Sequence, residues 1–338
     1  MATKPLSTAP QLTSSFTPPP SKFQGVISPD PASEFPAEKD RYVSQRISLL
    51  FSYTDKLEAL YLHLGCPWAH RTNIVYQLKR LQPIVALSVV SIHRDGVDGW
   101  NYDGTSKSDL VDPVEGFKNF KALYEKADPE YQGGYTVPLI WDRKKKTIVN
   151  NDSVGIIRIL ATAFDAFLAP EIREDNKPGG GLRPDSLAKE IDELGDRLEI
   201  GYNWGTYLCG MAKSQADYDD AMSRLFRLLD ELEKRLSSRK YLFGDHLTET
   251  DIRAFTTSVR FDMAYYTLFM CNYKMIRYDY PNLHRWLRQI YYEVDEETKD
   301  AFKSTTHFEI FMEGYALSAK RMTLVPWGPA VPMMPLDA

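Results

Sequence analysis

The fold of this chain is decided by the stretch Ala59-Leu60-Tyr61-Leu62-His63-Leu64-Gly65-Cys66-Pro67-Trp68-Ala69-His70-Arg71. Its apolar first half is typical of a buried strand, and a helical pattern begins after Gly65. Proline has no backbone N–H to donate and its φ already suits a helix, so Pro67 is predicted to be the first helical residue. Cys66 is then expected to occupy the cap position of that helix.

Cys66 is a candidate nucleophile. The free N–H groups and partial positive charge at a helix start favour the thiolate over the thiol, and Arg71 adds a positive charge one turn into the helix. We therefore expect the pKa of Cys66 to lie below the value of about 8.5 for a free cysteine. The alternative is that Cys66 is a buried small apolar residue, as most free cysteines are.

No metal site is expected at this position. Cys66 and His70 could share an ion, but two ligands do not complete a zinc site. No cluster of cysteines or histidines elsewhere in the sequence supplies the missing ligands.

A strand that ends in Cys-Pro-x-x at a helix start resembles the thioredoxin superfamily. The fourth place of this motif is Ala69, which cannot resolve a disulfide, and Cys209 and Cys271 lie far along the chain. A mixed disulfide on Cys66 would then be resolved by an external thiol such as glutathione. This is the chemistry of monothiol glutathione enzymes.

Composition limits the class of protein. With 338 residues, of which 43% are hydrophobic and 26% are charged, the chain can bury a large core and form about two domains. A formal net charge of −5 gives no reason to expect binding of nucleic acid. The three cysteines form no disulfide framework, and neither a membrane helix nor a signal peptide is predicted. We expect a cytoplasmic protein.

The chain pattern predicts an α/β part followed by a helical part. A helix over residues 72–81 and a strand over residues 84–90 follow the first strand, which makes a parallel βαβ unit. Residues 135–142 and 147–149 are expected to form a hairpin with a solvated basic turn. Beyond a Gly/Pro-rich linker, helices are expected over residues 187–204, 218–237, 251–266 and 283–294. Thr248 and Asp251 have the spacing of a capping box for the third of these helices.

Two further positions in the α/β part suit a peptide-like ligand. The bond between Val137 and Pro138 is a candidate cis peptide whose exposed Val137 backbone could pair with such a ligand, although an ordinary turn is equally compatible. Asp152 and Ser153 open the helix predicted over residues 154–164. They could simply cap it, or they could hold the γ-glutamyl end of glutathione.

Several blocks together resemble the glutathionyl-hydroquinone reductases, also called xi-class glutathione transferases. The resemblance covers roughly residues 60 to 300. The matching blocks are Cys66-Pro67-Trp68-Ala69-His70-Arg71, Gly99-Trp100, Thr136-Val137-Pro138, Ile148-Val149-Asn150-Asn151, Gly244-Asp245-His246-Leu247-Thr248-Glu249, Asp251-Ile252-Arg253, Val259-Arg260-Phe261-Asp262, Cys271-Asn272 and Tyr280-Pro281-Asn282-Leu283.

The resemblance implies a thioredoxin-like domain followed by an all-α domain, a homodimer, and glutathione as co-substrate. It implies that a cysteine removes glutathione from a glutathionyl-hydroquinone and that a second glutathione regenerates the cysteine. Cys66 would be this nucleophile. Trp100 and the Val137 backbone would hold glutathione, and Asp152 with Ser153 would bind its γ-glutamyl group. Tyr207 resembles a tyrosine that faces the quinone and could protonate the leaving carbon, although it could equally be a core residue.

The chain also departs from the family pattern. Asp152 stands where a longer Glu is usual, and Gly134 replaces a basic residue before Thr-Val-Pro. Residues 311–317 replace a Tyr-Tyr-x-Ser-His block, which changes the expected wall of the second substrate. Tyr315 is a candidate replacement for the lost tyrosine.

The expected domain organisation follows from composition and resemblance. We predict a partly disordered extension over residues 1–42, an insertion over 43–59, a thioredoxin-like domain over 60–170 and a linker over 171–186. An all-helical domain over 187–300 and a C-terminal extension over 301–338 follow. The insertion is expected to be an exposed loop and is a candidate translated intron, since family members pass almost directly into the first strand.

Two other functions stay open at this point. One is a general thioltransferase or a glutathione-conjugating transferase with an altered acceptor pocket. The other is a non-catalytic ligand carrier, against which the combination of Cys66, Pro67 and Arg71 argues.

Overall fold

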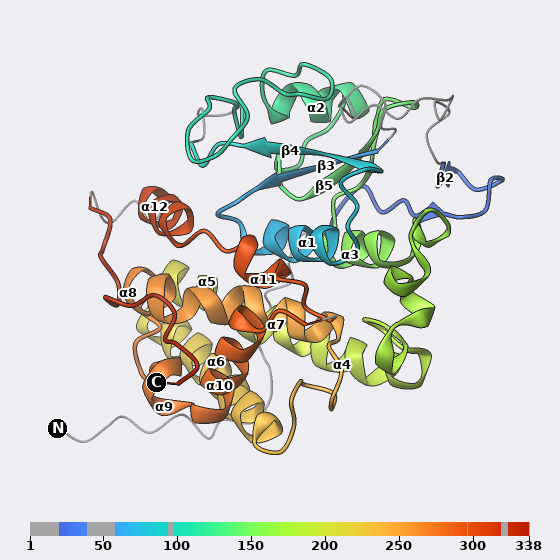
Figure 1. The fold of residues 1–338 in the computed structure, drawn as a ribbon. Coiled ribbons are helices and arrows are strands. Elements are labelled where there is room, and N and C mark those ends of the chain that lie inside the picture. Colours follow the sequence, from blue (N-terminus) through green and yellow to red (C-terminus); the bar gives the residue numbers. More distant parts are fainter. Residues whose placement is uncertain (1–19, 39–57, 94–97, 296, 319–323, 338) are drawn as a thin grey trace. The chain divides into compact units, whose positions relative to one another are not determined.

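The computed structural model describes residues 20–38, 58–93, 98–295, 297–318 and 324–337, which form two compact units (Figure 1). One unit comprises Pro20–Lys177 and Glu296–Ile310, and the other comprises Pro178–Asp295 and Phe311–Ala338. The first contains the sheet and the second is helical, so the predicted α/β domain followed by an all-α domain is confirmed.

A four-stranded sheet in the order β4-β3-β5-β6 organises the first unit. The strands are β3 (Glu58–His63), β4 (Val85–Val90), β5 (Leu139–Asp142) and β6 (Thr147–Asn150). β3 pairs in parallel with β4 and antiparallel with β5, as expected for a βαβ unit followed by a hairpin. Every residue of β3 is buried, which agrees with a central strand covered on both faces.

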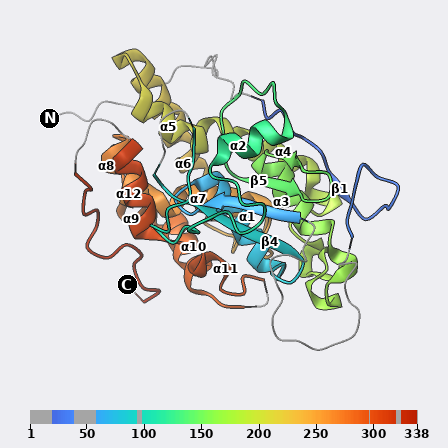
Figure 2. The same cartoon turned by 90° about the horizontal axis from the view of Figure 1, so that it is seen from above.

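Three helices cover the two faces of this sheet. α1 (Pro67–Leu78) and α3 (Ser153–Thr162) pack against each other on one face, and α2 (Phe120–Ala127) lies on the other (Figure 1). Figure 2 looks down on the sheet from the side of α2. Three residues separate the end of β3 from the start of α1, so the loop between them, which carries Cys66, lies at the carboxyl end of the central strand.

Residues 20–38, which belong to the predicted N-terminal extension, pack onto the sheet. The N–H of Gly25 donates to the Val149 carbonyl at 2.8 Å, and the N–H of Asn151 donates to the Phe23 carbonyl at 3.1 Å. A Cβ on Gly25 would lie 2.8 Å from that carbonyl oxygen, so only glycine allows this approach. The segment covers the exposed side of edge strand β6, whose backbone groups would otherwise lack partners. It also forms two short strands, β1 (Ile27–Ser28) and β2 (Phe35–Pro36).

Most of the predicted insertion lies outside the described residues. Of residues 43–59, Glu58 and Ala59 are described, and both belong to β3. The central strand therefore includes the last two residues of the predicted insertion.

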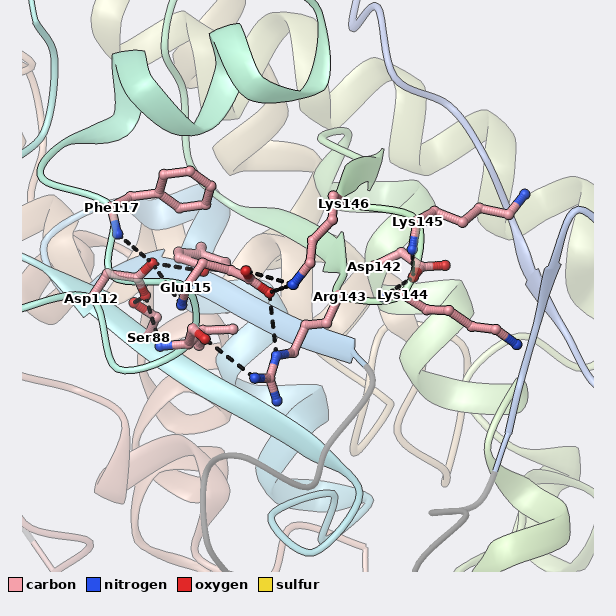
Figure 3. A network of polar contacts seen from close by, with 11 residues as sticks. Ser88, Asp112, Glu115, Phe117, Asp142, Arg143, Lys144, Lys145 and Lys146 are labelled. Atoms are coloured by element: carbon pink, nitrogen blue, oxygen red, sulfur yellow. Dashed lines mark hydrogen bonds and ion pairs between the residues drawn. The ribbon is translucent and has the colours of Figure 1, made fainter.

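The turn between β5 and β6 is basic and is paired with acids of the same unit (Figure 3). The Asp142 carboxylate accepts hydrogen bonds from the N–H groups of Lys144 and Lys145 at 2.8 Å each. Lys146 forms an ion pair with Glu115 at 2.7 Å. The turn is solvated as predicted, and its positive charge is largely matched locally.

The second unit contains the predicted helices with two interruptions. The π-helical turns Glu199–Asn203 and Phe261–Tyr265 divide the helices expected over residues 187–204 and 251–266. Its helices are α4 (Ala188–Leu198), α5 (Trp204–Met211), α6 (Gln215–Leu236), α7 (Glu249–Arg260), α8 (Tyr266–Leu268), α9 (Ile276–Asp279) and α10 (Pro281–Tyr292). α12 (Phe308–Ser318) begins at the end of the first unit and continues into the second. Short 3-10 turns occupy Asp165–Phe167, Pro170–Ile172 and Glu174–Asn176 in the first unit, and Pro178–Gly180 and Asp185–Leu187 in the second.

The boundary near the C-terminus differs from the prediction. Residues 297–310, expected to divide between the helical domain and a C-terminal extension, belong to the first unit and contain α11 (Ala301–Ser304). The local sequence does not indicate which unit a short segment packs against. For this reason, the sequence did not predict that residues 297–310 belong to the first unit.

Candidate active site

Cys66 lies at the start of α1, as predicted. It occupies the N-cap with extended backbone angles (φ −74°, ψ 126°), and Pro67 is the first helical residue. The Cys66 side chain makes no capping hydrogen bond, and the residue is partly exposed. The reading of Cys66 as a fully buried apolar residue is therefore excluded by its exposure, whereas its role as a nucleophile stays a prediction.

The Val137–Pro138 segment lies directly beside this thiol. The peptide bond is cis, as the sequence suggested. Cys66 Sγ is 3.7 Å from the Val137 carbonyl oxygen, so a ligand paired with the Val137 backbone would lie next to the sulfur. The Tyr124 hydroxyl donates to the Thr136 carbonyl at 2.9 Å and holds the residue before Val137.

Asp152 caps α3 and keeps one carboxylate oxygen available. Its Oδ2 accepts a hydrogen bond from the Gly155 N–H at 2.7 Å. Its Oδ1 has no hydrogen-bond partner among the described residues, and the side chain is partly exposed. The capping role is thus observed, and a second role toward a cationic ligand is geometrically open.

Arg71 joins the starts of α1 and α3. Its side chain is fully buried, and its Nη1 donates to Ser153 Oγ at 3.1 Å. The sequence predicted a positive charge near Cys66, and the structure places this guanidinium against the start of α3. The helix start and the Arg71 guanidinium both favour a negatively charged ligand at the start of α3.

Trp100 is fixed beside the end of β3. Its ring centroid lies 4.5 Å from that of His63, the last residue of the strand. Its carbonyl accepts a hydrogen bond from the Phe120 N–H at 3.0 Å, which anchors it to the start of α2. Trp100 is partly exposed.

Tyr207 belongs to the helical unit, where three phenols form a chain. The Tyr207 and Tyr315 hydroxyl oxygens are 3.0 Å apart, and those of Tyr315 and Tyr265 are 2.6 Å apart. Tyr265 is buried, and burial raises its pKa well above the ordinary value of a tyrosine. The sequence suggested Tyr207 and Tyr315 separately, but it did not indicate Tyr265. The match of Phe261-Asp262 to a family block was the only nearby signal.

The other two cysteines are unlike Cys66. Cys209 and Cys271 are fully buried in the helical unit, and burial raises the pKa of Cys271 well above its ordinary value. Over the residues described, no group of three or more His, Cys, Asp and Glu side chains is arranged to hold a metal ion. Within the same residues, no helix is long and apolar enough to span a membrane.

Two glutathione S-transferase family models and several related sequences match this chain. The family model "Glutathione S-transferase, N-terminal domain" matches residues 65–163, and the model "Glutathione S-transferase, C-terminal domain" matches residues 215–289. The chain is 40% identical to the glutathionyl-hydroquinone reductase YqjG of Escherichia coli K12 over 267 residues, which covers 79% of this chain and 74% of that protein. It is 38% identical to the "Glutathione S-transferase omega-like 2" of Schizosaccharomyces pombe, with 91% of both chains covered.

Solved structures are similar over nearly the whole length. The crystal structure of the glutathione S-transferase Xi from Phanerochaete chrysosporium superimposes with a TM-score of 0.82 at 39% identity, covering 95% of this chain and all of that one (100%). The glutathione-bound structure of YqjG superimposes with a TM-score of 0.79 at 36% identity and covers 93% of this chain and 94% of that one.

Proposed function

Because this chain belongs to the xi-class glutathione transferases, the family of the glutathionyl-hydroquinone reductases, we propose that it removes glutathione from glutathionyl-hydroquinones. The observation that carries the proposal is the partly exposed Cys66 at the start of α1, 3.7 Å from the Val137 carbonyl beside the cis-proline. Glutathione is the co-substrate, in keeping with the glutathione-bound structure of the E. coli relative.

The reaction passes through a mixed disulfide. The Cys66 thiolate attacks the sulfur of the glutathionyl conjugate, a sulfur–sulfur bond forms, and the carbon–sulfur bond breaks. The aromatic ring leaves with the electron pair and takes up a proton, which gives the hydroquinone. The thiolate of a second glutathione then attacks the mixed disulfide, so that glutathione disulfide leaves and Cys66 is regenerated. Overall, one conjugate and one glutathione become one hydroquinone and one glutathione disulfide.

The chain itself favours this external resolution. Ala69 occupies the place of a resolving cysteine, and the remaining thiols, Cys209 and Cys271, are fully buried. A thiol that is not part of this polypeptide must therefore reduce the disulfide on Cys66.

Glutathione is proposed to bind across three elements. The Val137 backbone lies beside Cys66 Sγ, and Trp100 is partly exposed. Asp152 Oδ1 would accept a charge-assisted hydrogen bond from the ammonium of the γ-glutamyl group. The carboxylate of the γ-glutamyl group would lie at the start of α3 near Ser153, where the helix dipole and the Arg71 guanidinium favour an anion.

Tyr207 is the proposed proton donor to the leaving carbon. Its hydroxyl is hydrogen-bonded to that of Tyr315, which can replace the proton that Tyr207 gives up. Tyr315 comes from residues 311–317, which depart from the family pattern. It would replace the tyrosine that this segment has lost and supply the hydroxyl next to Tyr207.

A panel of substrates distinguishes this function from the alternatives. We expect glutathione-dependent release of menadiol from glutathionyl-menadione. A general thioltransferase would instead reduce small glutathione mixed disulfides and leave the conjugate intact, a conjugating transferase would consume glutathione and an electrophile, and a carrier would do neither. Release of menadiol at the uncatalysed rate would refute the proposal.

We further propose a homodimer that works in the cytoplasm. Glutathione is kept reduced there, and the three cysteines of the chain are free thiols. Sedimentation velocity of the full chain tests the dimer, and fractionation of the source cells tests the location.

A further inference from the structure

A segment from late in the chain packs against the helix that begins at Cys66. Residues 297–310, here called the return segment, follow α10 of the helical unit in sequence but belong to the unit of Pro20–Lys177. Its short helix α11 packs against α1 (Figure 1). This contact has no assigned role in the proposed reaction.

One buried hydrogen bond joins the two elements. His70 Nε2 lies 2.9 Å from Thr305 Oγ1, and the two residues are 235 positions apart in sequence. Each is only 3% exposed. The Thr305 hydroxyl has a single hydrogen and lies 2.6 Å from the Ala301 carbonyl, so it donates to that carbonyl. His70 Nε2 therefore carries a proton and donates to Thr305.

The same histidine also holds the backbone of Cys66. The N–H of His70 donates to the Cys66 carbonyl at 2.9 Å, which is the first hydrogen bond of α1. His70 thus contacts the return segment through its ring and the cap residue through its main chain. A displacement of its ring would be transmitted to the turn that presents the thiol.

A second contact of the return segment is weaker. Lys107 Nζ lies 3.0 Å from His307 Nδ1 and 3.8 Å from Glu309, but the Lys107 and Glu309 side chains are 58% and 68% exposed. Exposed ion pairs contribute little to stability. Of these two polar contacts, the buried His70–Thr305 bond is the one that involves α1.

We propose that His70 and Thr305 are positioning residues that fix the first turn of α1 and thereby the Cys66 thiol. This rests on the proposed function of Cys66. Without the Thr305 hydroxyl, the buried imidazole N–H would lose its acceptor, which is costly, so the ring and the turn above it would shift. A shift of this kind slows a reaction because attack requires close alignment of the reacting atoms.

Thr305→Val tests this inference because it keeps the shape of the side chain and removes its hydroxyl. We expect the single-turnover glutathionylation of Cys66 by glutathionyl-menadione to slow by about tenfold. In steady-state turnover, kcat should fall by a larger factor than KM rises. Iodoacetamide alkylation of Cys66, which needs no glutathione, should slow as well. Thr305→Ser, which keeps the hydroxyl, should restore both rates.

Thr306→Val is the matched control. Thr306 is also buried, and its hydroxyl donates to the Phe302 carbonyl at 2.7 Å, but the described structure records no bond between it and His70. We expect this variant to lose a similar amount of thermal stability and to react at the wild-type rate. If Thr305→Val does not fold, the pair Thr305→Ser and Thr305→Ala provides the same comparison in a smaller side chain.

Wild-type alkylation rates in Thr305→Val, or equal slowing in Thr306→Val, would overturn the inference. The proposed function fails by a different result, namely no glutathione adduct on Cys66 in the wild-type protein. Because alkylation reports the thiol directly, the inference can be judged even in that case.

Discussion

The starts of α1 and α7 differ in how their unpaired N–H groups are treated. Every helix begins with N–H groups that have no partner within the helix. In α7, the capping box of Thr248 and Asp251 is complete. In α1, the cap position holds Cys66, whose thiol makes no capping bond and is partly exposed. One start is closed by its own side chains, and the other carries a partly exposed thiol.

The difference is also one of burial. The Asp251 carboxylate is completely buried and accepts hydrogen bonds from the Leu242 N–H at 2.9 Å, the Thr248 hydroxyl at 2.7 Å and Trp286 Nε1 at 3.0 Å. The start of α3 is intermediate, since Asp152 caps with one oxygen and keeps the other available. We infer that α7 uses its start for stability, whereas α1 and α3 keep theirs available for chemistry.

Cys66→Ser should have the largest effect. A serine hydroxyl is a far weaker nucleophile at neutral pH, and no other thiol of the chain is accessible, so reductase activity should fall by several orders of magnitude. The free energy of unfolding should hardly change. Cys209→Ala is the control, because a buried thiol without a catalytic role should leave the activity per folded molecule unchanged.

Asp251→Asn should break the closed helix start. The amide nitrogen cannot accept the hydrogen bonds that the carboxylate accepts, and we expect a loss of about 3 kcal/mol in the free energy of unfolding. Denaturant titration measures it. Activity per folded molecule should stay near that of the wild type, and a selective loss of activity would contradict the division between the two helix starts.

Stability should depend on pH through the same carboxyl. Burial raises the pKa of Asp251 to about 6, above the unfolded value of 3.8. The folded state therefore binds more protons than the unfolded state between these values, so this group's contribution to stability is greatest below about pH 4 and is lost as the pH rises to about 6. The difference between the wild type and Asp251→Asn in denaturant titrations should show this slope. An opposite slope would mean that hydrogen bonding outweighs burial.

Asp152 can be tested with two substitutions that separate its roles. Asn is a good helix cap but carries no charge, so Asp152→Asn should keep stability and weaken glutathione binding by about 1.5 to 3 kcal/mol. Asp152→Ala should lose stability as well. Isothermal titration calorimetry measures the affinity, and an unchanged affinity in the Asn variant would mean that Asp152 is only a cap.

Tyr207→Phe should have the smallest effect. We expect release of the aromatic product to slow on the order of tenfold, less than the full contribution of a general acid because water can also protonate the ring. Glutathione affinity should be unchanged. A parallel fall in turnover and in glutathione affinity would indicate a structural role for Tyr207.

The parts that the sequence predicted are those encoded locally. The buried strand before Cys66, Pro67 at the first helical position and the Thr248–Asp251 capping box each depend on neighbouring residues, and all three are observed. The sequence left two interpretations of Val137–Pro138, a cis peptide bond and an ordinary turn, because both use the same residues.

The parts that were missed depend on distant contacts. Residues 20–38 look disordered by composition, yet they pair with β6 because that strand offers unpaired backbone groups. The bond between His70 and Thr305 joins segments 235 residues apart, and neither segment alone indicates it. Tyr265 joins Tyr315 and Tyr207 only after the helical unit has folded.

The central claim is that Cys66 carries the reaction, and intact-protein mass spectrometry with peptide mapping tests it most directly. The reduced protein is mixed with stoichiometric glutathionyl-menadione in the absence of free glutathione. We predict one glutathione adduct per chain, located on Cys66, together with an equal amount of released menadiol. Release of menadiol with no adduct, or with the adduct on Cys209 or Cys271, would contradict the account.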